Sequence, residues 1–215
     1  MLGKIVLMAA CAAVLALAKP PERAVRVVTT DQVDFNGGAI HVNNAYGELN
    51  VEGWDEPRVE ITVTRSTFRP PGQKEQEEGT AYLNRIKVTM QKAANGDVEI
   101  STQFPGRNRL LRVIHGLGDF TLDYRIKVPR NAKLSIRHGV GDVIILNVGG
   151  DIDAAIRSGD IVVQLPDQGK YTVDAKCKLG SVYKDVDGSQ AGSGHTLHLR
   201  SLVGGISIQR SGVGL

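Results

Sequence analysis

A glycine–aspartate pair recurs every nine residues in the second half of the chain. The pairs are Gly141-Asp142, Gly150-Asp151 and Gly159-Asp160, and each is followed at once by a short apolar run. Self-similarity at a fixed period is typical of proteins built from stacked repeats, in which no single repeat can bury its own apolar face. The period therefore predicts that this part of the chain folds as a stack of short elements.

The stacked elements are predicted to be β-strands. Aligned copies place apolar residues in two columns, two positions apart: Leu134, Val143, Ile152 and Ile161, and then Ile136, Ile145, Ala154 and Val163. Alternate residues of a strand share a face, so both columns can point into one core. A helix fits poorly, because β-branched residues and glycine dominate and a period of 3.6 residues is absent. We expect successive copies to lie directly above one another, with the Gly-Asp pairs at the corners.

The sequence around the repeats predicts further strands and one helix. Alternating apolar residues indicate strands near residues 25–30, 39–43, 58–64, 86–91, 97–103 and 120–129. Asn95-Gly96 is a strong signal for a turn between two of these strands. We expect that hairpin to cover one end of the repeats. A polar segment over Gln73–Arg85 predicts a short helix over an edge or an end of the sheets.

The stretch LDYRIKVPRNAKLSIRHGVGDVIILNVGGDIDAAIRSGDIVV, at residues 122–163, carries a family resemblance. An alternating strand ends in valine-proline, and successive Gly-Asp-apolar units follow. This pattern resembles the bacterial putative-adhesin domain family of unknown function, which is related to autotransporter adhesin head domains. The likeness spans most of residues 39–210. It implies an all-β, β-solenoid or β-helix-like fold in an exported or envelope protein, with no catalytic residues and no cofactor.

The first eighteen residues are predicted to be a signal peptide. Lys4 supplies the positive start, residues 5–17 are uninterruptedly apolar, and Ala16-Leu17-Ala18 fits a cleavage site. Residues 19–38 then form a lead-in, and residues 39–215 form the repeat domain. We expect export to the periplasm, the cell surface or the medium. Lipid attachment at Cys11 is the alternative anchor, and no later segment is apolar enough to span a bilayer.

Charge and cysteine content exclude two classes of function. The net charge is only +3, and the chain has no long basic run and no aromatic-rich basic face, so we expect no nucleic-acid partner. After removal of the leader, Cys177 is the only cysteine. The mature chain therefore has no intramolecular disulfide and no cysteine metal site.

Two groups of residues are candidate binding sites. Arg107, Arg109 and Arg112 fall in one loop, which either meets an anionic surface or sugar or is simply solvated. The aspartates of the repeat, Asp142, Asp151 and Asp160, either cap turns or bind a cation such as calcium. The His195 and His198 side chains, three residues apart on a strand, are expected to lie on opposite faces.

Two hypotheses of function follow. The first is a non-enzymatic β-solenoid module of the bacterial envelope, a scaffold or adhesion surface whose partners are envelope proteins or surface glycans. The second is a carbohydrate-active enzyme, a polysaccharide lyase or hydrolase, that uses exposed aspartates such as Asp151 and Asp153 on a β-helical scaffold. An enzyme of this kind would hold two or more carboxylates in a long groove.

Overall fold

The computed structural model describes residues 25–67, 73–104, 120–186 and 194–211, which form an all-β protein with one helix. In chain order the elements are β1 (Val25–Asp34), β2 (Ala39–Tyr46), β3 (Glu48–Trp54), β4 (Arg58–Thr67), α1 (Gln73–Asn84), β5 (Lys87–Lys92), β6 (Val98–Gln103), β7 (Phe120–Pro129), β8 (Lys133–Val140), β9 (Val143–Leu146), β10 (Ile152–Ser158), β11 (Ile161–Leu165), β12 (Tyr171–Leu179), β13 (Val182–Asp185), β14 (His195–Val203) and β15 (Ile206–Arg210).

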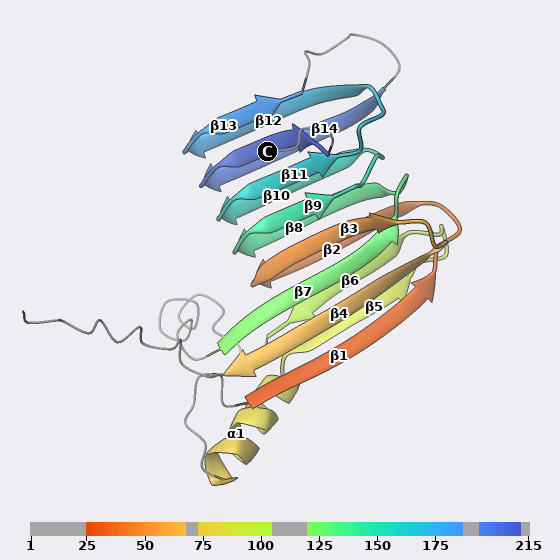
Figure 1. Cartoon of the computed structure of the whole chain (residues 1–215). Helices are drawn as coiled ribbons and strands as arrows, with labels where there is room; N and C mark the ends of the chain where they lie inside the picture. The colour runs from red at the N-terminus through yellow and green to blue at the C-terminus, as the bar shows by residue number, and fades with distance from the viewer. Residues whose placement is uncertain (1–24, 68–72, 105–119, 187–193, 212–215) are drawn as a thin grey trace, which may run out of the picture.

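The strands form two mixed sheets that bury one core between them. Sheet A has eight strands in the order β1-β4-β7-β3-β9-β11-β15-β13, and sheet B has seven in the order β12-β14-β10-β8-β2-β6-β5. Figure 1 shows both sheets running from the strands near α1 at one end to β12 and β13 at the other. The fold class predicted from the alternating pattern, an all-β stack of short strands with one helix, is confirmed at this level.

Successive copies of the nine-residue repeat lie in different sheets. Leu134 on β8 pairs with Ile152 on β10 in sheet B, whereas Val143 on β9 pairs with Ile161 on β11 in sheet A. The prediction of directly stacked copies was therefore wrong, because strand neighbours are eighteen residues apart. Each Gly turn carries the chain from one sheet to the other, so that two consecutive copies bury their apolar faces against each other. We call such a unit, for example β8 with β9, a strand pair.

The spatial order of the strand pairs differs from their order in the chain. The last pair, β14/β15, lies between β10/β11 and β12/β13. Near the other end, β2/β3 lies between β6/β7 and β8/β9. Figure 1 shows both insertions as breaks in the colour sequence along the stack. All the pairings that join these strand pairs are parallel.

Antiparallel strands and the helix close one end of the stack. β5 pairs with β6 in sheet B, as the Asn95-Gly96 turn predicted, while β4 pairs with β7 and β1 with β4 in sheet A. Helix α1 lies against β1 and β4, so the helix over an edge of the sheets is confirmed. Residues 25–34, which the sequence assigned to the lead-in, are the edge strand of sheet A. No helix in the described residues is long and apolar enough to span a membrane.

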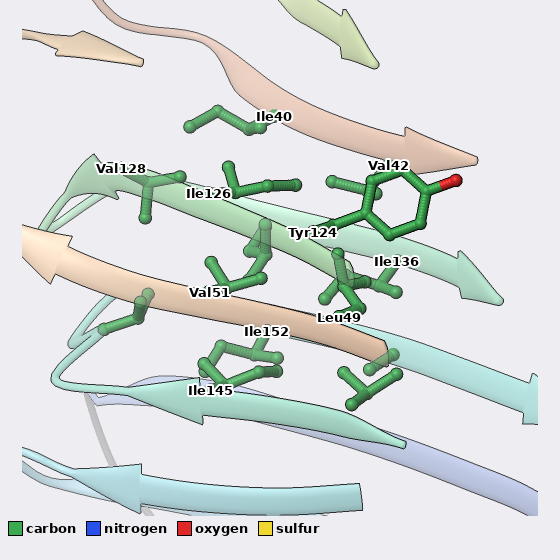
Figure 2. Packing of buried hydrophobic residues seen from close by; sticks show 14 of the residues in the cluster. Ile40, Val42, Leu49, Val51, Tyr124, Ile126, Val128, Ile136, Ile145 and Ile152 are labelled. Atoms are coloured by element: carbon green, nitrogen blue, oxygen red, sulfur yellow. The ribbon is translucent and has the colours of Figure 1, made fainter. Parts of the chain in front are cut away.

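The core is a continuous cluster of inward-facing aliphatic side chains (Figure 2). The eight residues of the two predicted columns are all fully buried: Leu134, Ile136, Val143, Ile145, Ile152, Ala154, Ile161 and Val163. Ile152 has Leu134 on one side and Leu197 on the other. Apolar residues of both sheets therefore fill the space between them without a break.

The turn glycines are of two kinds. Gly141 and Gly159 both have φ of 127°, a conformation that L side chains rarely adopt. Gly150, in contrast, does not have a positive φ. At Gly150 the constraint is space, because an added Cβ would lie 2.2 Å from the Ala132 carbonyl oxygen. Glycine is therefore required at Gly141 and Gly159 because of the backbone conformation, and at Gly150 because the Ala132 carbonyl oxygen leaves no room for a side chain.

Candidate binding surface on sheet B

A row of polar side chains crosses the outer face of sheet B. His41 on β2, Ser135 on β8, Asp153 on β10 and His198 on β14 occupy the same register on four adjacent parallel strands. Each lies next to a buried residue such as Ile40, Leu134 or Ile152, so the four side chains point away from the core. Adjacent strands are about 4.8 Å apart, so the row presents hydrogen-bonding groups at close, regular intervals. We call these four residues the polar row.

Arginine side chains lie beside this row, two residues further along the strands. The guanidinium of Arg137 donates to the Asp153 carboxylate, with 2.6 Å between Nη2 and Oδ2. Arg200 donates in the same way to Asp174 on β12. This bond is the main cause that lowers the pKa of Asp174, and partial burial opposes it. These ion pairs hold the outward carboxylates in fixed positions.

A shallow groove follows the row where the strands of sheet B begin. Its volume is about 560 Å³, and it is lined by side chains of four adjacent strands and by the turns that precede them. The lining includes the whole polar row together with Lys133, Asp151 and Thr196. Arg200 adds a guanidinium at its border. The groove therefore combines imidazole, hydroxyl, carboxylate and ammonium groups, which together offer both hydrogen-bond donors and acceptors.

The turn carboxylates bind backbone amides of the neighbouring strand pair. Asp142 Oδ1 accepts from the Asp160 amide at 2.9 Å, and Asp160 Oδ1 accepts from the Gly205 amide at 2.6 Å. On the opposite turns, Asp151 Oδ1 accepts from the Thr196 amide at 2.9 Å, and Asp97 Oδ1 from the Ala39 amide at 2.7 Å. This backbone bond is the main reason that the pKa of Asp97 is lowered. Each of these aspartates therefore ties one strand pair to the next.

The three aspartates of the repeat do not form one ladder. Asp142 and Asp160 lie on the turns that enter sheet A, and Asp151 lies on a turn that enters sheet B. Strands nine residues apart face each other across the core, which separates Asp151 from the other two. Within the described residues, no group of three or more His, Cys, Asp and Glu side chains is arranged to hold a metal ion.

Three histidines of sheet B each face a carboxylate. His195 Nδ1 lies 3.5 Å from Asp151 Oδ1, and His198 Nδ1 lies 3.4 Å from Asp174 Oδ2. On β2, His41 Nε2 lies 3.6 Å from Asp97 Oδ2. His195 and His198 thus contact different acids.

The remaining sequence candidates lie elsewhere. Arg107, Arg109 and Arg112 are outside the described residues, as are the predicted leader and Cys11. Sequence reasoning missed His41, Ser135 and Arg137 as site residues. Only their outward positions in alternating strands distinguish them in the sequence, and that pattern does not show which strands are neighbours.

Comparison with known proteins supports the fold. No family model matches the chain, and no curated protein matches it. A putative cell adhesion protein from Clostridium sporogenes is similar in structure, with a TM-score of 0.51 and 12% identity over 86% of this chain and 100% of that one. A putative adhesin from Parabacteroides merdae has a TM-score of 0.31 and 10% identity over 73% of this chain and 67% of that one. The resemblance to adhesin-like proteins seen in residues 122–163 is thus confirmed for the fold.

Proposed function

We propose that the protein is an exported, non-enzymatic binding module of the bacterial envelope, built as a short, flattened β-solenoid. The parallel strand pairs, each contributing one strand to each sheet, support the solenoid architecture. The fold similarity to a putative cell adhesion protein supports an adhesive role. The proposed leader over residues 1–18 supports export.

The ligand surface in this proposal is the groove on sheet B, and the ligand is a surface glycan. The polar row carries the proposal, because four strands of one rigid sheet fix its spacing. A rigid row of donors and acceptors binds a hydroxyl-rich chain at a small cost in side-chain ordering. Asp153 stays held by Arg137, so it can accept hydrogen bonds without moving.

A glycan array tests this assignment. The purified protein should bind a subset of bacterial surface polysaccharides, and His41→Ala with His198→Ala should reduce that binding at least tenfold. Ser207→Ala and Gln209→Ala, on the outer face of sheet A, are the matched control and should leave binding unchanged. Equal loss in both double variants would overturn the assignment to sheet B, and binding to none of the polysaccharides would overturn the ligand class.

The enzyme hypothesis is tested by the same polysaccharides. Asp151 and Asp153 both line the groove, but Asp151 binds the Thr196 amide and Asp153 binds Arg137. A non-enzymatic module should leave each bound polysaccharide intact after long incubation. Chain cleavage that Asp151→Asn or Asp153→Asn abolishes would replace the binding module by a hydrolase or lyase.

Export is tested separately. Mass spectrometry of the envelope and secreted fractions should find a mature protein that begins at Lys19. An N-terminal peptide that carries lipid at Cys11 would show that the protein is a lipoprotein instead.

A further inference from the structure

Among the described residues, the end of the stack formed by β12 and β13 has no cap; we call it the open end, and the end that α1 covers the capped end. β12 is the last strand of sheet B and β13 the last strand of sheet A. Among the described strands, β12 pairs only with β14, and β13 only with β15. The outer edges of both strands therefore present backbone amide and carbonyl groups that no described strand covers, and such an edge is a template for another strand.

Apolar side chains are exposed at the same end. Of the six large apolar side chains that the described residues expose, all but Val28 are found here: Leu179, Val182, Tyr183, Leu202 and Val203. The pairing of Leu179 with Val203, and of Val182 with the buried Ile206, places the cluster at one corner of the open end. Clustered exposed apolar residues mark a surface that another molecule covers.

The two edge strands are not equally available. β13 has only four residues, all exposed, and its Lys184 occupies an inward register opposite the buried Ile208. A short edge strand with an inward charge is protected against further pairing. β12 has nine residues, and Val173 and Ala175 face inward in register with Leu197 and Leu199. β12 is therefore the edge that can accept a further strand.

We propose that β12 pairs antiparallel with β12 of a second copy of this chain, in a two-fold symmetric dimer centred on Ala175. This register sets Asp174 opposite Lys176 of the other copy, and Lys176 opposite its Asp174. Val173 then faces Cys177, so inward residues meet inward residues. Opposite charges directly across two strands stabilise their pairing.

Neighbouring registers fit less well. The pleat allows only shifts of two residues between facing positions, because a one-residue shift would set inward residues against outward ones. Centring the pair on Asp174 sets two carboxylates against each other, and centring it on Lys176 sets two ammonium groups against each other. Only the register through Ala175 has two opposite-charge pairs and no like-charge pair.

The opposite end of the molecule favours a closed dimer over a filament. A head-to-tail filament would seat β12 and β13 on β5 and β1 of the next copy. Helix α1 lies against β1 at that end, and β1 contacts β5, which closes the gap between the sheets. An interface that repeats the same surface on both copies closes on itself and leaves each capped end free. The dimer does not rest on the glycan assignment, and it is judged by sedimentation and not by glycan binding, because Asp174 also contacts His198 of the polar row.

Sedimentation of the purified protein over a range of concentrations tests the dimer. The wild type should form dimers, and Lys176→Asp should raise the dissociation constant about tenfold, because two like-charge pairs replace two attractive ones. Adding Asp174→Lys to Lys176→Asp exchanges the charges and should restore the dimer. Lys178→Asp, which faces Thr172 of the other copy, is the matched control and should have little effect.

A disulfide tests the register directly. Antiparallel partners that face each other have Cα atoms about 4.5–5.5 Å apart, within disulfide reach. Ala175→Cys with Cys177→Ser should therefore give a covalent dimer on oxidation, whereas Lys178→Cys with Cys177→Ser should not. A monomer at every concentration, or a dimer that Lys176→Asp leaves unchanged and Ala175→Cys does not trap, would overturn the proposal.

Discussion

The two ends of the stack are built from different kinds of sequence. At the capped end, strands β1, β4 and β5 run antiparallel to their neighbours, and Phe120 packs against Tyr46, Tyr82 and Phe104. At the open end, the outermost strand pair follows the same pattern as the inner pairs, and its side chains other than Tyr171 are half-buried or exposed. Repeating sequence can extend such a stack, but only non-repeating sequence closes it within one chain.

The middle of the stack should be the most sensitive region. Ile152→Ala should lower the free energy of unfolding by about 2–5 kcal/mol, because it opens a cavity between Leu134 and Leu197. Ile144→Ala on the outer face of β9 is the matched control and should cost much less. Urea denaturation measures both values. Equal losses would mean that burial does not set the stability of this region.

The same substitution at each end compares the ends directly. Val63→Ala, on β4 of the capped end, should cost about 2 kcal/mol, since Val63 is 2% exposed. Val182→Ala, on β13 of the open end, should cost about 0.5 kcal/mol or less, since Val182 is 37% exposed. Thermal melts at a concentration where the protein is monomeric compare the two. A larger loss at Val182 would contradict the difference between the ends.

Substitution of a turn aspartate should lower the free energy of unfolding by a smaller amount, and the loss should depend on whether another strand pair lies beyond that turn. Asp142 and Asp160 each bind an amide of the next strand pair toward the open end, where Ser181 follows Gly180 at the outermost turn. Asp160→Ala should cost about 1 kcal/mol, because the Gly205 amide loses its acceptor. Asp160→Asn keeps an oxygen acceptor and should cost less. Ser181→Ala, where no described strand lies beyond, should change the melting temperature little.

The pH dependence of stability should separate the interior from the open end. Burial lowers the pKa of His138 from its usual 6.5, and backbone carbonyls nearby offset part of this shift. Since the unfolded chain then binds the proton more tightly, stability is full above about pH 6.5 and falls as the pH drops below that value. His138→Gln should remove this part of the fall, which urea titrations at several pH values measure.

At the open end, we expect acid to reduce the stability of the fold at a lower pH. Arg200 is the main cause that holds the pKa of Asp174 below 3.8, so the Asp174 carboxylate stabilises the fold above about pH 4. That contribution is lost as the pH falls through the lowered pKa of the folded state. Asp174→Asn should therefore lower stability above about pH 4, remove this loss in strong acid, and leave the loss below pH 6.5 in place. If one variant changed both the loss below pH 6.5 and the loss in strong acid, the assignment of these losses to His138 and Asp174 would be contradicted.

Local sequence patterns were sufficient to locate strands and turns along the chain, but they did not predict which strands lie side by side in the sheets. Alternation located β4 and β7, and Asn95-Gly96 located the turn between β5 and β6. The same patterns could not show that β14 lies between β10 and β12, because alternation reports which face of a strand is apolar and not which strand lies beside it. His198 therefore meets Asp174 and Asp153 through pairings that no spacing in the chain reveals.

The aspartates of the repeat show a second case in which the sequence pattern did not reveal which residues are neighbours. The nine-residue period correctly placed aspartates at the corners, where they bind backbone amides. It did not show that alternate copies cross to the other sheet. One sheet of copies nine residues apart and two sheets that receive alternate copies give the same apolar columns in the sequence. The burial of Ile152 and Val143 was predictable, and the separation of Asp151 from Asp142 was not.

The inserted strand pairs have a consequence for how the chain acquires its structure. β2/β3 cannot gain both neighbours until β6 to β9 exist, and β12/β13 has no inner neighbour until β14/β15 has entered between it and β10/β11. Assembly in the order of synthesis would therefore leave a gap that only residues 195–210 fill. We expect a chain truncated before β14 to remain sensitive to protease. The part of the stack that holds β12 and β13 can therefore become compact only after β14 and β15 have been synthesised.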